Sequence, residues 1–200
     1  LIARSYIMDI YKCDYFNLYF LDIKIDEPLN KKMKENLDLR VAGKNDIPLI
    51  RALAKICFYD TYRKILSAEQ LDYMYDMMYS EASLNLQISE GHYFVLAYKG
   101  EECAGYVSYQ FEQGNSAHLH KLYILPAFQG CGIGRVMIEY VFAKVKEYYH
   151  GDSCYVELNV NRQNHAYHFY KKLGMEEVAS GDFPIGGGYY MCDYIMRKDL

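Results

Sequence analysis

The sequence contains no tryptophan and only four prolines, and none of its six cysteines belongs to a C-x-x-C pair. A zinc site is therefore not expected, and no other metal site is predicted. Lysine and arginine total 22 against 26 acidic residues, and the net charge of −4 argues against a nucleic-acid-binding surface. The most apolar early stretch, residues 15–25, includes Asn17, Asp22 and Lys24, so it is too polar to cross a bilayer.

The residues that are present indicate a folded domain. Hydrophobic residues make up 52% of the 200 positions and charged residues 24%, and tyrosine is unusually frequent at 23 positions. The cysteines lie in apolar stretches, which favours free thiols over the alternative of a disulfide framework. Because no targeting segment is recognised, we expect a cytoplasmic protein with no membrane partner.

The first 32 residues differ from the rest. They are dense in tyrosine, phenylalanine and aspartate, and the chain resembles a conventional protein start from Met33. One interpretation makes residues 1–32 an N-terminal extension, artefactual or disordered. Partial alternation over residues 17–25 leaves a genuine strand as the alternative. Residues 33–200 are predicted to form a single domain.

Hydrophobic periodicity predicts an α/β protein. Alternating or apolar runs predict strands over residues 37–42, 93–98, 103–111, 117–125, 154–160, 175–179 and 189–197. Helical spacing predicts four helices, which end near residues 59, 78, 149 and 173. Hairpins dominate this order, so the sheet should be mixed rather than doubly wound and parallel.

A glycine-rich segment, Gln129-Gly130-Cys131-Gly132-Ile133-Gly134, joins a predicted strand to a long predicted helix. Free N–H groups of such a loop and of the helix start form an anion site that suits a pyrophosphate. A Walker loop is excluded, because Arg135 and Val136 follow Gly134 where lysine and serine or threonine are required. The G-x-G-x-G spacing is also a poor match to the dinucleotide-binding fingerprint.

These residues resemble the GNAT superfamily of acetyl-CoA-dependent N-acetyltransferases. The loop matches the Q/R-x-x-G-x-G/A signature, and residues 161–175 are similar to the N-x-A-x-x-F-Y-x-K-x-G-F block. The resemblance covers about residues 37–200. It implies a GNAT-like, mostly antiparallel sheet with splayed fourth and fifth strands, flanked by about four helices.

Three shorter segments resemble spermidine/spermine acetyltransferases of the PaiA type. They are residues 58–62, the pair Phe128-Gln129 and residues 193–196. This narrower match implies a polyamine acceptor.

The family resemblance implies acetyl-CoA as cosubstrate. The loop and Arg135 would hold the pyrophosphate, the fourth strand would pair with the pantetheine arm, and Asn164 would lie near the thiol. The implied cofactor-binding residues are Leu122, Tyr123, Ile124, Gln129, Gly130, Cys131, Gly132, Ile133, Gly134, Arg135 and Asn164.

The resemblance also implies a tyrosine general acid at Tyr170. A family glutamate on the fourth strand is replaced here by His118 and His120, which share one face of that strand and are candidate bases. Glu157 on the fifth strand is a second candidate. Packing alone remains the alternative for both histidines.

The expected function is direct transfer of acetyl to a primary amine, a small cationic amine such as a polyamine. Six carboxylates would suit it if several converge: Asp60, Glu69, Asp72, Asp76, Asp182 and Asp193. The alternatives are acetylation of a protein N-terminus or lysine, and a non-catalytic CoA-binding module. A homodimer is left open.

Overall fold

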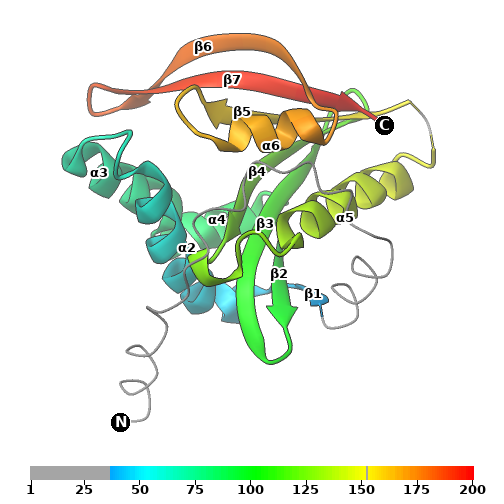
Figure 1. Ribbon diagram of the computed structural model, residues 1–200, viewed down its shortest axis with the longest axis horizontal. Helices are drawn as coiled ribbons and strands as arrows, with labels where there is room; N and C mark the ends of the chain where they lie inside the picture. The colour runs from blue at the N-terminus through cyan, green and yellow to red at the C-terminus, as the bar shows by residue number, and fades with distance from the viewer. Residues whose placement is uncertain (1–36, 152) are drawn as a thin grey trace. The chain divides into compact units, whose positions relative to one another are not determined.

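The computed structural model describes residues 37–151 and 153–200, and it forms one sheet with helices on both faces (Figure 1). Seven strands are ordered β1-β2-β3-β4-β5-β7-β6. The strands are β1 (Leu37–Val41), β2 (Tyr93–Lys99), β3 (Glu102–Glu112), β4 (Ser116–Ile124), β5 (Tyr155–Asn161), β6 (Glu176–Gly186) and β7 (Tyr189–Asp199). The α-helices are α2 (Ile47–Tyr62), α3 (Ala68–Tyr79), α4 (Glu81–Ser89), α5 (Ile133–Tyr148) and α6 (Ala166–Lys172), with short 3-10 turns at Lys44–Asp46 and Pro126–Phe128.

The sheet confirms the predicted fold class. Its neighbouring strands are antiparallel except for β4 and β5, which run parallel. The parallel pair is joined through α5, as a crossover connection requires. The last hairpin turns through Gly186, Gly187 and Gly188, all at positive φ, which glycine adopts without steric cost.

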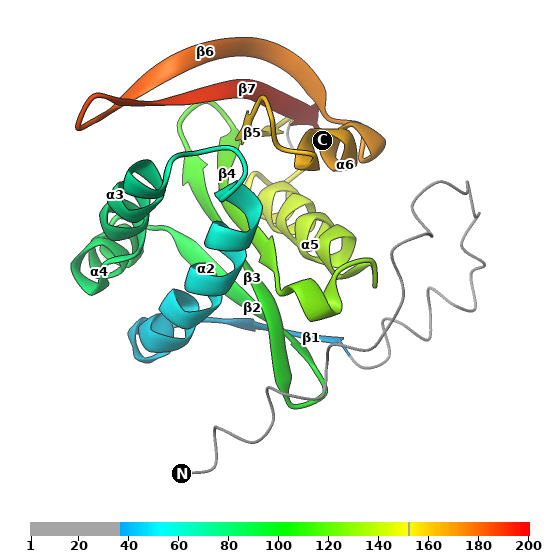
Figure 2. The same ribbon diagram turned by 60° about the vertical axis from the view of Figure 1, so that its left-hand side comes forward.

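Two apolar layers hold the helices to opposite faces of the sheet (Figure 2). Helices α2, α3 and α4 pack on the face that carries Phe94, Leu96 and Tyr106. Helices α5 and α6 pack on the other face, where Val95 and Val107 lie. Because side chains alternate along a strand, one apolar run in β2 serves both layers.

Strands β4 and β5 part after a short stretch of pairing. Their register begins at Ser116 with Tyr155 and ends at Leu119 with Leu158. A bulge follows at once, since Ser108 of β3 pairs with Lys121 while Tyr109 pairs with Leu119, which leaves His120 without a partner on β3. A bulge bends and twists its strand, so β4 turns away from β5 here. The predicted splay is therefore present.

The structure contains one helix more than predicted. In α4 the apolar residues Ala82, Leu84, Leu86 and Ile88 alternate, which is a strand-like pattern, yet the segment is helical. Its N-cap is Ser80, whose hydroxyl accepts a hydrogen bond from the N–H of Ser83. Strand β6 is also longer than predicted, because nearly all of its residues are exposed and give little hydrophobic pattern.

Other predictions have mixed outcomes. The prediction for residues 1–32 lies outside the described residues. Five cysteines fall within them, and all five are free thiols: Cys57, Cys103, Cys131, Cys154 and Cys192. Across the described ranges, no helix has the length and hydropathy needed to span a bilayer.

At Gly105 of β3 the sheet has no room for a side chain. A Cβ atom here would lie 2.2 Å from the backbone oxygen of Tyr123 on β4. We expect Gly105→Ala to lower the free energy of unfolding by about 3 kcal/mol, because backbone rather than a flexible side chain must move. Chemical denaturation measures the loss. Gly43→Ala is the control, since no atom lies within 4 Å of its Cβ position, and equal stability of the two variants would contradict the prediction.

Candidate functional site

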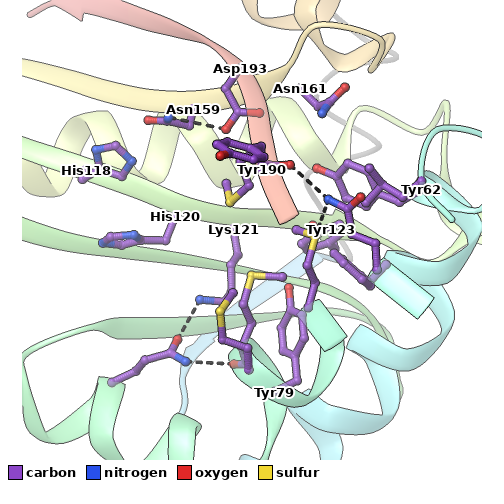
Figure 3. Close-up of a pocket in the computed structure, with 18 of the residues that line it drawn as sticks. Tyr62, Tyr79, His118, His120, Lys121, Tyr123, Asn159, Asn161, Tyr190 and Asp193 are labelled. Carbon is purple, nitrogen blue, oxygen red and sulfur yellow. Dashed lines mark hydrogen bonds between the residues drawn. The ribbon is translucent and has the colours of Figure 1, made fainter. Parts of the chain in front are cut away.

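A cavity of about 330 Å³ lies where β4 and β5 part (Figure 3). The first residues of β7 and side chains of α2, α3 and α4 also line it. Aromatic rings, amides and thioethers make up most of its wall. The residues that line it are Phe58, Tyr62, Leu66, Gln70, Met74, Met77, Met78, Tyr79, Gln87, His92, His118, His120, Lys121, Tyr123, Asn159, Asn161, Tyr190, Met191 and Asp193. Its size is at the lower end for small-molecule sites.

Three histidines stand together on one wall. The ring centroids of His118 and His120 are 4.7 Å apart, and His92, just before β2, stacks on His120 at 4.2 Å. Shielding from water lowers the pKa of His92 to about 4, with Lys121 and His118 adding to the effect. All three rings are therefore neutral at pH 7.

The two candidate bases differ in their electrostatic surroundings. The pKa of His120 is lowered by loss of water and then by His118, His92 and Lys121, although the ring is open to the cavity. Loss of water also lowers the pKa of His118, but the carboxylates of Glu112 and Glu157 act in the opposite direction. Nearby carboxylates therefore favour the protonated form of His118 and not that of His120.

Lys121 lies beside these rings although simple alternation would point it to the other face. The bulge at His120 places consecutive residues, His120 and Lys121, on the same side of β4. The side chain is 8% exposed, and burial lowers the pKa of its ammonium group to about 8. It remains mostly protonated at pH 7.

One buried carboxylate, Asp193 of β7, faces the cavity at 2% exposure. Asn159 donates to its Oδ2 at 3.4 Å, and burial raises the pKa of the carboxyl group. The other five candidate acids do not line the cavity. Asp182, for example, is paired with Arg162, and Asp60 lies 3.0 Å from Arg63. The condition set for a polyamine acceptor, that several of these carboxylates converge, is therefore not met at this cavity.

Tyr170 of α6 lies at the edge of the site rather than in its wall. It is 7% exposed, and burial raises the pKa of its phenol, with a smaller contribution from Tyr62. Tyr62 itself lies close to Tyr123 and Asn164. A cluster of phenols therefore connects α2, β4 and the start of α6 across the parting strands.

The glycine loop presents free backbone donors. Gly130 and Gly132 have φ of 74° and 75°, and Gly132 is the N-cap of α5. Within the described part of the chain, the N–H groups from Gly130 to Arg135 donate to no protein acceptor. The Gln129 side chain instead folds back and donates to the carbonyl of Ile124 at 3.1 Å. Such a turn fits an anion with several oxygens.

The predicted residues thus fall into two groups. Leu122, Tyr123 and Ile124 lie on the length of β4 that pairs with β3 but not with β5, and a 3-10 turn joins it to the loop. His118 and His120 lie in the cavity. Arg135 is exposed and lies 3.7 Å from Glu139, while Glu157 is held by Arg197 at 2.7 Å and does not line the cavity.

His92, Lys121 and Asn159 line the cavity but were not among the candidate site residues from the sequence, and Tyr62 was named only within the segment 58–62. No local signal identifies Lys121, because β4 also contains polar residues and simple alternation would place this side chain on the other face. His92 stands alone in a turn, and its place beside β4 depends on long-range pairing of β2 with β3.

Comparison with known proteins agrees with this geometry. A model of the acetyltransferase (GNAT) family matches residues 50–175, which include the glycine loop and the three histidines. An uncharacterized N-acetyltransferase from the pepI 3' region of Lactobacillus delbrueckii subsp. lactis is 24% identical over 167 residues, which are 79% of this chain and 94% of that protein.

Two further relatives match different shares of the chain. A peptidyl-lysine N-acetyltransferase of Escherichia coli K12 is 38% identical over 60 residues, 30% of this chain and 35% of that protein. The crystal structure of the PaiA N-acetyltransferase from Thermoplasma acidophilum with coenzyme A superposes with a TM-score of 0.67. It covers 82% of this chain and 99% of its own at 23% identity, so this likeness shows the fold.

The neutral histidine stack predicts a pH-dependent stability. Unfolding restores the ordinary pKa of about 6.5 to each ring, so below that pH the unfolded state binds more protons than the folded state. We expect the free energy of unfolding to fall as pH drops from about 6.5 to 5. His92→Phe should keep the stacking on His120. It should reduce the slope of the free energy of unfolding against pH by the equivalent of up to about one bound proton.

Urea denaturation at a series of pH values measures this slope. His168→Phe is the control, because His168 is exposed on α6 and outside the stack. A slope that is the same in His92→Phe and in the unmodified protein would show that His92 is not held neutral.

Proposed function

Because the chain belongs to the GNAT family of acetyltransferases, we propose that it transfers acetyl from acetyl-CoA to the primary amine of a small molecule. One observation carries this proposal: the length of β4 that does not pair with β5 lines the cavity and continues, through a 3-10 turn, to the free N–H groups of the glycine loop. With the diphosphate of the cosubstrate bound at the loop, its thioester would reach the acceptor between β4 and β5.

The residues present fit the cosubstrate. The N–H groups of Gly130 to Arg135 would bind its pyrophosphate, and the unpaired edge of β4 from His120 to Ile124 would pair with its amide-containing arm as a further strand does. Asn164 is held by its own side chain, which accepts from the N–H of Ala166 at 2.9 Å. It would lie near the thiol end.

The reaction needs a neutral amine. The amine nitrogen forms a bond to the acyl carbon, the carbon–sulfur bond breaks, and the sulfur takes up a proton. We assign removal of the amine proton to His118, alone or through water, because nearby carboxylates make it more basic than His120. The backbone N–H of His120, which has no partner on β3 at the bulge, would stabilise the negative charge that develops on the thioester oxygen.

Tyr170 would supply the proton to sulfur. Its raised pKa keeps the phenol protonated throughout the neutral range, and the neighbouring Tyr62 connects it to the cavity. A role in packing is the competing explanation, because the side chain also belongs to the apolar layer around α5.

The acceptor amine would be held by Asp193. A polyamine of the PaiA type remains a prediction, supported by likeness of fold, but the cavity offers one carboxylate rather than several. We therefore propose an acceptor in which a single ammonium group faces Asp193. A lysine side chain of a protein is the second candidate, favoured by the similarity to the peptidyl-lysine enzyme.

The proposal is tested by release of CoA thiol with a panel of acceptors. The panel contains simple alkylamines, amino acids, spermidine and lysine-containing peptides. Turnover of a small amine supports the proposal, and turnover of peptides alone favours the second candidate. Binding of acetyl-CoA without turnover on any acceptor would support the non-catalytic module instead.

The glycine loop predicts a specific binding defect. In Gly132→Val the valine backbone cannot adopt a φ of 75° without strain. The loop must therefore change its conformation and turn its N–H groups away. We expect the Kd for acetyl-CoA to rise about 10-fold or more, since several charge-assisted hydrogen bonds are lost. Isothermal titration calorimetry measures the change.

Gly151→Val is the matched control. Gly151 has a φ of 81° but lies beyond the other end of α5, with no atom within 4 Å of its Cβ position. An equal loss of affinity in both variants would mean that backbone strain, and not the loop, is responsible.

Replacement of Tyr170 is expected to impair turnover but not the binding of acetyl-CoA. Tyr170→Phe removes the proton donor and keeps the ring, so kcat should fall by roughly 10²-fold or more while the Kd for acetyl-CoA changes little. Steady-state kinetics and calorimetry separate the two effects. Tyr149→Phe, at the end of α5 and away from the cavity, serves as the control. Unchanged kcat would exclude Tyr170 from proton transfer.

A further inference from the structure

The cavity contains a buried ammonium group that lacks a carboxylate partner among the described residues. Lys121 donates to Oε1 of Gln87 at 2.7 Å, and its Nζ lies 5.8 and 5.6 Å from the ring centroids of Tyr79 and Phe94. In the described ranges no Asp or Glu oxygen lies within 4.0 Å of this nitrogen. Buried charges in proteins are ordinarily paired.

The single protein acceptor of Lys121 is fixed in place. Nε2 of Gln87 donates to the carbonyl of Met78 at 2.8 Å and to the hydroxyl of Ser83 at 2.9 Å, so its oxygen is the atom that faces Lys121. An ammonium group has three donors, and one is used here. Lys121 and Gln87 both line the cavity, so a ligand in it would lie beside this ammonium group (Figure 3).

The rest of the cavity limits which ligand fits. The neighbouring imidazoles are neutral at pH 7, so among the described residues that line the cavity Lys121 is the only cationic group and Asp193 the only anionic one. Asp193 lies beside Asn159 at the β7 side, while Lys121 points toward Gln87 on α4 (Figure 3). Four thioethers contribute apolar surface: Met74, Met77, Met78 and Met191. A second ammonium group would meet repulsion from Lys121.

We propose that Lys121 is a specificity-determining residue that binds a carboxylate of the acceptor. The acceptor is then a primary amine that carries a carboxylate at the far end of an apolar body, such as an ω-amino acid. Asp193 binds the amine end and Lys121 the carboxylate end. This inference rests on the proposed acetyltransferase function.

The test compares acceptors that differ only in the carboxylate. One pair is methionine and 3-(methylthio)propylamine, and a second pair with wider spacing is 6-aminohexanoate and hexylamine. For the unmodified protein we expect kcat/KM to be roughly 10-fold or more higher for the carboxylate member of at least one pair, mainly through a lower KM. Lys121→Met should bring the two members to within about 2-fold, and Lys121→Arg should retain the preference.

The outcomes separate the inference from the proposed function. A structural role of Lys121 would change both members of a pair equally and leave their ratio intact, which would overturn the inference. Turnover of both amines with no preference for the carboxylate in the unmodified protein would also overturn it, while the acetyltransferase function stands. If acetyl-CoA binds and no acceptor of either pair or of the wider panel is acetylated, both proposals fail.

Discussion

The site depends on the point where β4 and β5 stop pairing. Strand β5 is held by β7 along its whole length, and β4 is held by β3, so neither strand is free to follow the other. Pairing between them ends at Leu119, and the bulge at His120 is the next residue. Since a bulge adds a residue to one strand and increases its twist, it directs β4 away from β5 without loss of the sheet.

The same bulge determines which side chains meet. Without it, His118 and His120 would share one face and Lys121 would lie on the opposite face with Leu119. With it, Lys121 joins the histidines, and the alternation resumes so that Tyr123 also faces the cavity. One inserted residue therefore makes the gap for a cosubstrate and changes the charge of the wall beside it.

Much of the fold could be predicted because its signals are local. The capping serine Ser67, the glycine turn at 186–188 and the apolar stripe of α5 each specify an element within a few residues, and each is present. Helix α4 was missed because Leu84 and Leu86 alternate like strand residues, and its burial depends on α2 and α3. Tertiary packing there overrides the local pattern.

The site was less predictable, because its chemistry depends on register. The family motifs identified the glycine loop and Tyr170, both of which are contiguous in sequence. His92 and Lys121 reach the cavity only through pairing of β2 with β3 and of β3 with a bulged β4, and neither the turn at His92 nor a single lysine signals this. The six candidate acids were chosen by residue type alone, which does not show whether they converge, and ion pairs at the surface account for two of them.

The two charges of the cavity lie on strands that the splay separates. Asp193 pairs in register with Asn161 at the end of β5, while Lys121 belongs to β4. An acceptor that contacts both groups therefore bridges the gap in which the thioester would lie, and its amine is oriented by two contacts instead of one. Orientation of this kind reduces the entropic part of the barrier. A polar pair in a shielded wall is costly when empty, and a ligand with matching charges would offset that cost by satisfying both groups at once.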